Sequence, residues 1–231
     1  MNGRQVSRPS ALLALALLLP LPSLGAAAAL HWWPGAAWSQ VVFGLCKVAL
    51  LILPACWHRW VDGQPWRWPR LPSAQHIWAG LASGLLIAVI VAAGILLAAD
   101  RLFDVASAAE HLAVAGFDSP LVFVAGAAYW TLINSLLEEY VWRWFVADRF
   151  ARLLPARLAV IAAGLAFGVH HVIALGAYVP WTTAAAAGAA VAIGGIVWSC
   201  HRALSGSVLP GWLSHVLVDA AAFLSIGLLL L

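Results

Sequence analysis

Two adjacent glutamates lie inside a segment that is otherwise apolar enough to cross a membrane. They are Glu138 and Glu139, in the stretch Leu-Leu-Glu-Glu-Tyr-Val-Trp-Arg that ends at Arg143. A charged side chain at the centre of a bilayer costs about 3 kcal/mol on insertion scales, so ionisable residues within spans indicate a functional site by default. The pair therefore predicts carboxylate chemistry carried out within the membrane.

Two further apolar segments carry side chains that could share in that chemistry. One contains His170 and His171, and the other contains His215 and Asp219. Residues four positions apart lie on one face of a helix, so Asp219 can hold the His215 imidazole in one orientation. His171 has the same spacing to Phe167, and we therefore interpret His170 as a structural residue or one that supports the site through a neighbour.

The spacing also separates the two glutamates. Glu139 and Arg143 are four positions apart, so they are expected to pair on one helix face. Glu138 points about 100° away around a regular helix and is expected to be the carboxylate that is free for chemistry. Asn134, four positions before Glu138, is interpreted as bonding a neighbouring helix rather than lining the same cavity. Lys47 is expected to pair or to extend toward the membrane surface.

The composition predicts a polytopic membrane protein. Hydrophobic residues make up 64% of the chain and charged residues 9%, whereas roughly 25% of a soluble domain is charged. A single membrane domain over residues 1–231 is expected, because no long polar linker divides the chain. Nucleic-acid binding is not indicated, because the basic residues are spread over loops that flank the membrane.

Apolar stretches of about 20 residues predict transmembrane helices. The expected fold is an all-α transmembrane bundle of about seven spans, at residues 11–30, 36–57, 77–99, 120–147, 157–178, 182–200 and 208–231. Residues 1–30 also resemble a secretory signal peptide, so this segment is either the first span or a cleaved leader. Residues 102–117 are expected to form a short amphipathic helix or a loop.

The distribution of cations predicts the orientation. If seven helices alternate, the loops on one side hold Arg4, Arg8, Arg59, Arg67, Arg70, Arg149, Arg152, Arg157 and Arg202. The opposite loops hold Arg101 beside four acidic residues, which are Asp100, Asp104, Glu110 and Asp118. Because positively charged loops stay in the cytoplasm, the N-terminus is expected inside and the C-terminus outside.

The polar side chains are also expected at a similar depth. At 1.5 Å per residue, Glu138 lies about 15 Å from Asp148 at the inner end of its span. His171 lies about 21 Å from Arg157, and His215 is about ten residues, or 15 Å, from the loop before its span. Three helices that run in alternating directions would therefore bring these groups near a common level.

The ordered motifs resemble those of a known family. The motifs are Glu138-Glu139-x-x-x-Arg143, Phe167-x-x-x-His171 and His215-x-x-x-Asp219. Their order and spacing are similar to the motifs of the CAAX prenyl-protease and bacteriocin-processing family (CPBP or ABI), whose members are glutamate-dependent intramembrane endopeptidases. The resemblance covers roughly residues 120–225, which we expect to form the catalytic core.

The resemblance implies a role for each motif residue. Glu138 would be the general base that activates a water molecule, with help from His171. Glu139 and Arg143 would hold the site together. Amide hydrolysis needs a deprotonated water and donors aimed at the developing negative charge, so these residue types suit the reaction.

Position 219 departs from the pattern of the better-known members. The resemblance implies that His215 and the residue at 219 stabilise the oxyanion of the tetrahedral intermediate. Asp219 stands where those members carry Asn, and an ionised carboxylate cannot donate a hydrogen bond. Asp219 is therefore expected either to be protonated by its apolar surroundings or to orient His215.

Two other classes of function remain open from the sequence. A metal-dependent membrane hydrolase could use Glu138, His171 and His215 as three zinc ligands with a fourth position open, although the chain has no HExxH motif. A proton or ion transporter would also keep Glu, His and Asp inside spans, and a bacteriocin-immunity protein could retain the same motifs without activity.

The favoured interpretation is an intramembrane endopeptidase without a cofactor. It would hydrolyse a peptide bond in a membrane-associated or exported protein or peptide, for sorting or maturation. Its expected partners are membrane lipid and a substrate with a membrane-embedded or lipidated segment. The chain is rich in Ala, Trp and Arg and has one Lys, which is typical of GC-rich bacterial genomes, so a bacterial inner membrane is the expected location.

Overall fold

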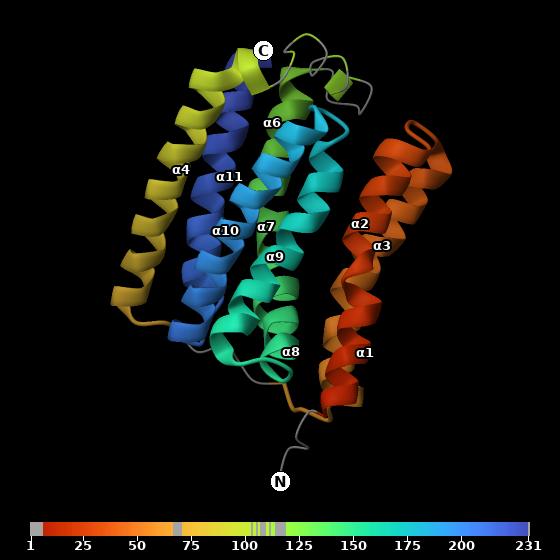
Figure 1. The fold of residues 1–231 in the computed structure, drawn as a ribbon, viewed down its shortest axis with the longest axis vertical. Coiled ribbons are helices and arrows are strands. Elements are labelled where there is room, and N and C mark those ends of the chain that lie inside the picture. The colour runs from red at the N-terminus through yellow and green to blue at the C-terminus, as the bar shows by residue number, and fades with distance from the viewer. Residues whose placement is uncertain are drawn as a thin grey trace.

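The computed structural model describes residues 7–66, 71–102 and 119–230, together with positions 104, 106, 110, 112 and 113. Within these residues, seven helices are long and apolar enough to cross a membrane. They run side by side along the long axis of the molecule (Figure 1). The all-α bundle of seven spans predicted from the sequence is confirmed.

Several spans contain more than one helical element. The first comprises α1 (Arg8–Leu18), α2 (Pro20–Ala27) and η1 (Ala28–Trp32), and the second comprises α3 (Ala37–Cys56) and η2 (Trp57–Val61). The third is α4 (Ala74–Leu102). The fourth comprises α6 (Pro120–Ala128), η3 (Tyr129–Asn134), α7 (Ser135–Glu138), η4 (Glu139–Val146) and α8 (Ala147–Ala151). The last three are α9 (Ala156–Leu175), α10 (Trp181–Ser205) and α11 (Leu209–Leu230).

The spans end a few residues from the predicted limits. The first begins at Arg8 and the fourth continues to Ala151, whereas the fifth ends at Leu175. Helices continue past the apolar stretch because polar side chains at a membrane surface do not stop a helix. Most of the segment 102–117, expected to be a helix or a loop, lies outside the described residues.

Local sequence signals explain where several helices begin and end. Ser7 and Ser119 each cap a helix, accepting hydrogen bonds from the backbone N–H of Ser10 and Val122. Such caps satisfy amide groups that the first turn leaves without partners. At the C-terminal end of α10, Gly206 adopts a left-handed conformation with φ of 71°, which glycine allows without steric cost.

The fourth span alternates between α-helical and π-helical segments. The elements η3 and η4 are π-helical, and the short helix α7 lies between them. Glu138 is the last residue of α7 and Glu139 is the first of η4. π-Helical turns inside helices occur frequently at functional sites, and here they change the helical register around both glutamates.

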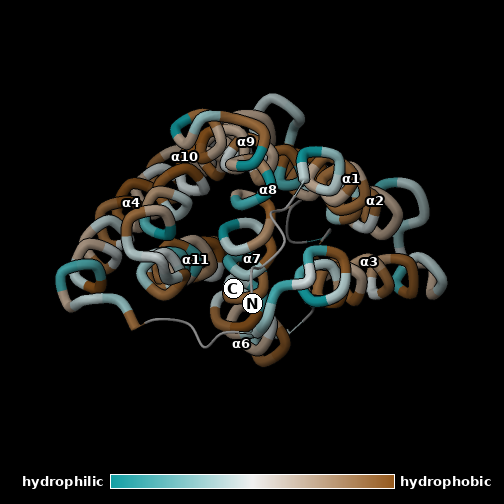
Figure 2. The backbone as a smooth tube through the Cα atoms, turned by 90° about the horizontal axis from the view of Figure 1, so that it is seen from below, coloured by the Kyte–Doolittle hydropathy of each residue, from teal (hydrophilic) through white to brown (hydrophobic). Residues whose placement is uncertain are grey.

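Small residues allow close packing between helices, as is common in membranes. On α4, a Cβ added at Gly84 would lie 2.6 Å from Ser214 Cα on α11. On α9, a Cβ at Gly168 would lie 2.6 Å from the carbonyl oxygen of Gly188 on α10. Viewed along the helices, α4, α10, α9, α1, α2 and α3 form an arc around α7 and α11 (Figure 2). The motif-bearing α7 and α11 are therefore held inside the arc.

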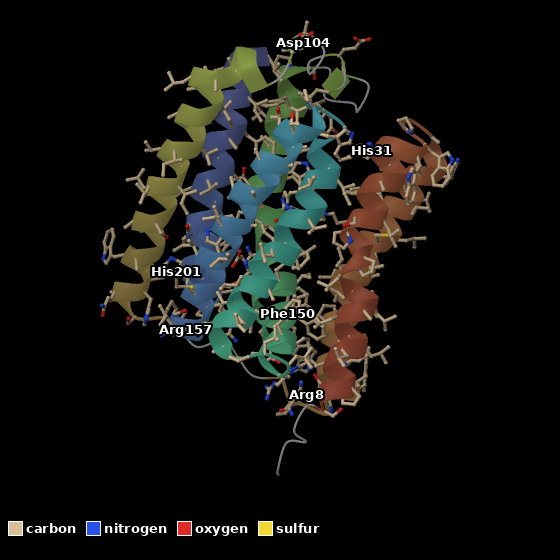
Figure 3. All side chains as sticks on the ribbon, in the orientation of Figure 1. Arg8, His31, Asp104, Phe150, Arg157 and His201 are labelled. Atoms are coloured by element: carbon tan, nitrogen blue, oxygen red, sulfur yellow. The ribbon has the colours of Figure 1, made fainter. Side chains whose placement is uncertain are left out.

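The N-terminal helices are fastened to the rest of the bundle by polar contacts at both ends. At one end, Arg149 Nη2 lies 2.5 Å from Asp62 Oδ2, and both side chains are buried. At the other end, His31 Nε2 bonds the carbonyl oxygen of Ile173 at 2.7 Å. Arg8 and Arg157 lie near the first of these ends, and His31 lies toward the second (Figure 3). The first two spans are thereby fixed against the motif-bearing helices.

The substitution Gly84→Ala should destabilise the bundle. A Cβ there meets backbone atoms of α11, and overpacking of this kind costs about 1–3 kcal/mol. The matched control is Gly94→Ala in the same helix, where nothing lies within 4 Å of an added Cβ. That change should leave stability equal or slightly higher, since alanine favours helix. Thermal unfolding in detergent, followed by tryptophan fluorescence, measures both. Equal midpoints for the two variants would contradict the close packing of α4 on α11.

Candidate active site

The two glutamates meet different surroundings. The Glu139 side chain is completely buried, whereas that of Glu138 is 13% exposed. The change from α-helical to π-helical backbone falls between them. Glu139 therefore faces neighbouring helices, and Glu138 is the carboxylate that a small molecule can reach.

Glu139 is surrounded by cationic and aromatic groups. Its Oε1 lies 3.3 Å from Arg143 Nε and 3.2 Å from His215 Nδ1. The guanidinium carbon of Arg143 lies 4.1 Å from the ring centre of Phe167 and 5.0 Å from that of Trp198. Within the described residues the guanidinium forms no hydrogen bond, so charge attraction and ring stacking hold it. This buried pair connects α9, α10 and α11 to the fourth span.

His215 is oriented by contacts on several sides. Its ring stacks on Trp198 with centroids 3.8 Å apart, and the Trp198 indole N–H donates to Ser214 Oγ at 3.0 Å. Its Nε2 lies 3.7 Å from Glu138 Oε2 and 3.6 Å from Asp219 Oδ1. Because Nδ1 faces Glu139, the ring presents Nε2 to the space beside Glu138. The surrounding carboxylates supply the negative charge that a doubly protonated ring would need.

Both histidines of α9 lie near Glu138. The Nδ1–H of His171 donates to the carbonyl oxygen of Phe167 at 3.0 Å, which leaves Nε2 available as an acceptor. His170 stacks parallel to Trp142 and places Nε2 4.0 Å from Glu138 Oε1. The sequence predicted that His170 has a structural role or supports the site through a neighbour, whereas its ring lies directly beside the candidate base.

A group of three side chains has the spacing of metal ligands. One atom from each of Glu138, His170 and His171 lies within 4.8 Å of the other two. The set proposed from the sequence included His215 in place of His170. In the structure, His215 instead turns Nδ1 toward Glu139. The chemistry of this group is therefore one carboxylate and two imidazoles, a donor set that suits zinc.

Asn134 and Lys47 extend the site toward α3. Asn134 Nδ2 donates to Glu138 Oε1 at 2.8 Å, and Lys47 Nζ donates to Asn134 Oδ1 at 2.6 Å. The ammonium also lies 4.8 Å from the ring centre of Trp130. Asn134 thus both bonds a neighbouring helix and lines the site, whereas the sequence predicted the first of these alone. The position of Asn134 four residues before Glu138 was the signal for the second.

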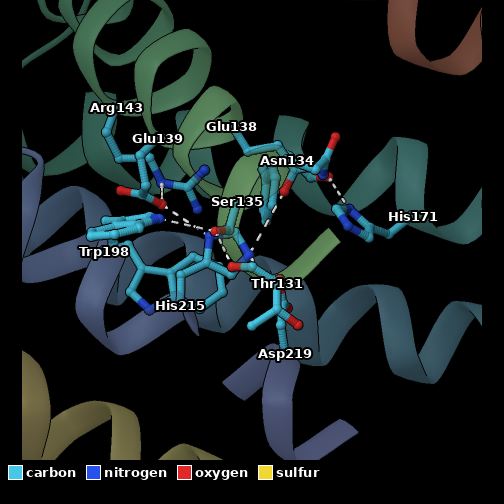
Figure 4. Close-up of polar contacts among 12 residues, drawn as sticks. Thr131, Asn134, Ser135, Glu138, Glu139, Arg143, His171, Trp198, His215 and Asp219 are labelled. Carbon is cyan, nitrogen blue, oxygen red and sulfur yellow. Dashed lines mark hydrogen bonds and ion pairs between the residues drawn. The ribbon is translucent and has the colours of Figure 1, made fainter. Parts of the chain in front are cut away.

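Figure 4 shows the motif side chains converging from three spans. Glu138, Glu139 and Arg143 come from the fourth span, and His171 comes from α9. His215 and Asp219 come from α11, and Trp198 of α10 lies beside them (Figure 4). A reachable carboxylate therefore lies between imidazoles from two other helices, inside an apolar bundle.

Loss of the Arg143 charge should destabilise the protein strongly. Arg143→Met leaves Glu139 buried with less compensation, and breaking a buried pair costs about 3–5 kcal/mol. The matched control is Arg152→Met, which breaks a second Arg–acid pair with the same four-residue spacing, Arg152–Asp148, at the end of this span. Both of its side chains are more than 40% exposed, so the cost should be below about 1 kcal/mol. Unfolding in detergent compares the two, and similar losses would contradict a buried ionic core.

Comparison with known proteins gives one family match. Residues 120–221 match the family described as Rce1-like, type II CAAX prenyl endopeptidase Rce1-like. No curated protein matches the chain, and no solved structure does so either. The matched segment contains all three motifs and Trp198, whereas Lys47 precedes it. The resemblance seen in the motifs is confirmed over residues 120–221. This segment is similar to the type II CAAX prenyl endopeptidases, a family of membrane proteases.

Proposed function

We propose that the chain is a glutamic-type intramembrane endopeptidase with Glu138 as its general base. One observation carries the proposal. The partly exposed Glu138 carboxylate lies between His170 of α9, at 4.0 Å, and His215 of α11, at 3.7 Å. A base surrounded by imidazoles in an apolar bundle has the groups that water-mediated amide hydrolysis needs. The family match adds that relatives of this segment are endopeptidases.

The proposed first step is activation of water. Glu138 Oε2 takes a proton from a water molecule, and the hydroxide attacks the carbonyl carbon of the scissile bond. His171 accepts a hydrogen bond from that water through Nε2, because its Nδ1 is engaged by the Phe167 carbonyl. Glu138 then gives the proton to the departing amine, so water is consumed and one acid and one amine form.

His215 is the proposed oxyanion donor. With Nδ1 directed to Glu139, a doubly protonated ring carries an N–H at Nε2 that points to the reacting carbonyl oxygen. A positioned donor of this kind is worth about 3–4 kcal/mol in transition-state stabilisation. Asp219 Oδ1 lies 3.6 Å from the same nitrogen, which favours the role of orienting His215 over that of donating to the oxyanion.

Glu139 and Arg143 are proposed to hold this arrangement without touching the substrate. Glu139 is fully buried and contacts His215, so the glutamate fixes the ring from behind. A Cβ added at Gly211 would lie 2.8 Å from Glu139 Oε2, and glycine at this position therefore lets α11 approach the carboxylate. The pair thus determines where Nε2 of His215 lies.

The proposed substrate is a protein or peptide with a membrane-embedded or lipidated segment. The chain is an integral membrane protein, so a bond cleaved beside Glu138 must be delivered within or near the bilayer. We further propose a bacterial inner membrane, with the N-terminus inside and the site opening toward the cytoplasmic half. The location of Arg8 and Arg157 near one end of the bundle supports this orientation (Figure 3). No nucleic acid is involved.

Glu138→Gln should abolish cleavage while preserving folding, because the amide cannot accept the proton from water. The measurement compares protein termini by mass spectrometry in host cells that express wild-type protein or the variant. New termini should be present with wild type and missing with Glu138→Gln. The control is Glu110→Gln, which changes an exposed glutamate and should leave the termini unchanged. Identical termini for wild type and Glu138→Gln would instead support the transporter or immunity alternative.

A metal-dependent hydrolase is the second candidate, and the spacing of Glu138, His170 and His171 favours it. Bound zinc would lower the pKa of a coordinated water and so supply the nucleophile. We expect the purified protein to remain active after dialysis against a strong chelator and to contain less than one metal ion per chain. If activity is lost on chelation and restored by added zinc, Glu138 is a metal ligand and not the general base.

A further inference from the structure

Lys47 occupies a position that the motifs do not explain. It is the only lysine of the chain, and it lies in the middle of α3, ten residues after Ala37 and nine before Cys56. At 1.5 Å per residue, about 15 Å of helix separates it from either end, which is more than a lysine side chain can span. The side chain is half-buried. A cation at this depth requires compensation from the protein.

The positive charge of Lys47 is compensated by the carboxylate of Glu138, and the side-chain amide of Asn134 links the two groups. Lys47 Nζ donates to Asn134 Oδ1 at 2.6 Å, and Asn134 Nδ2 donates to Glu138 Oε1 at 2.8 Å. An ammonium can only donate and a carboxylate can only accept, so the amide has one possible orientation between them. Through these two hydrogen bonds, the position of α3 determines where one oxygen of Glu138 lies.

This contact distinguishes the two oxygens of Glu138. Oε1 is bound by Asn134 and lies on the side of His170, at 4.0 Å from its Nε2. Oε2 lies on the side of His215, at 3.7 Å from its Nε2. With Oε1 anchored, Oε2 is directed toward the group that we propose to bind the oxyanion.

The charges of the site divide into two sets. Glu139 is compensated by Arg143, at 3.3 Å. Lys47 provides a second cation on the opposite flank, stabilised by the ring of Trp130 at 4.8 Å. Through Asn134 this cation is directed at Glu138, so each glutamate has its own positive counterpart.

We propose that Lys47 is a positioning residue for the general base, acting through Asn134, and that the N-terminal helices are thereby part of the catalytic machinery. The inference rests on the proposed function of Glu138. Of the two alternatives expected for Lys47, pairing or extending to the membrane surface, it builds on pairing, because a surface-directed lysine would have no coupling to Glu138. It also places a required residue outside the segment 120–221 that matches the family.

The first test measures catalysis. Lys47→Met keeps the length of the side chain and removes its charge, so kcat should fall about 10–100-fold, the cost of a misplaced catalytic group. KM should stay nearly constant, because Lys47 does not contact the substrate. Lys47→Arg should recover part of the loss, since a donor to Asn134 returns. The control is Val48→Met, an exposed neighbour on the same helix, which should behave as wild type. Wild-type kcat in Lys47→Met would overturn the inference.

The second test is independent of activity. Thermal midpoints in detergent are compared for wild type, Lys47→Met, Glu138→Gln and the double variant. Because each single change leaves one buried charge without its counterpart, the double variant should lose less stability than the sum of the two single losses. Additive losses would overturn the inference while leaving Glu138 as the base. If wild type cleaves nothing, the proposed function fails, and with it the catalytic role of Lys47. In that case, non-additive changes in the thermal midpoints would show that Lys47 and Glu138 form a charge pair with a structural role only.

Discussion

The desolvated contact between Glu139, Arg143 and His215 is the constraint on which the rest of the site depends. Charges removed from water need partners at defined distances, so the three helices that supply Glu139, Trp198 and His215 cannot shift independently. A buried ion pair adds little net stability compared with apolar packing, because desolvation offsets the attraction. Its contribution here is to fix the positions of these helices relative to one another. With Glu139 engaged by its neighbours, the adjacent Glu138 is left as the reachable carboxylate.

The hydropathy of the sequence predicted the seven spans, because a helix in lipid must be apolar over about 20 residues. Spacing of four residues also predicted that Glu139 would meet Arg143. The contacts of His170 with Glu138 and of Trp198 with His215 were not predictable in this way. They join different helices, and their formation depends on how far each helix is rotated and tilted, which no spacing within one helix encodes. The π-helical turns also escaped prediction, because a local change of helical register leaves no mark in the hydropathy of a span.

The N-terminal spans and the family-matched segment form a shared site rather than a core and an appendage. Asp62 and His31 fasten the first two spans at opposite ends, and Lys47 contacts Asn134 between those fastenings. The second span, which contains α3, is thereby held directly at its Asp62 end, and the first span beside it is held at the opposite end. This arrangement explains how a cation carried by a span without recognisable motifs can be held within hydrogen-bond distance of the fourth span.

The π-helical segment η4 has a consequence for insertions and deletions. A π-helical turn holds about one residue more than an α-helical turn, so losing one residue from η4 can restore regular α-helical geometry while changing the directions of side chains within the segment. A single-codon deletion between Glu139 and Val146 would therefore preserve a membrane-spanning helix of almost unchanged hydropathy. It would nevertheless change which neighbours the side chains of Glu139 and Arg143 meet on α9 and α11. Such a protein would insert into the membrane normally but would have no activity. Frame-preserving deletions in this stretch would therefore abolish catalysis without affecting membrane insertion.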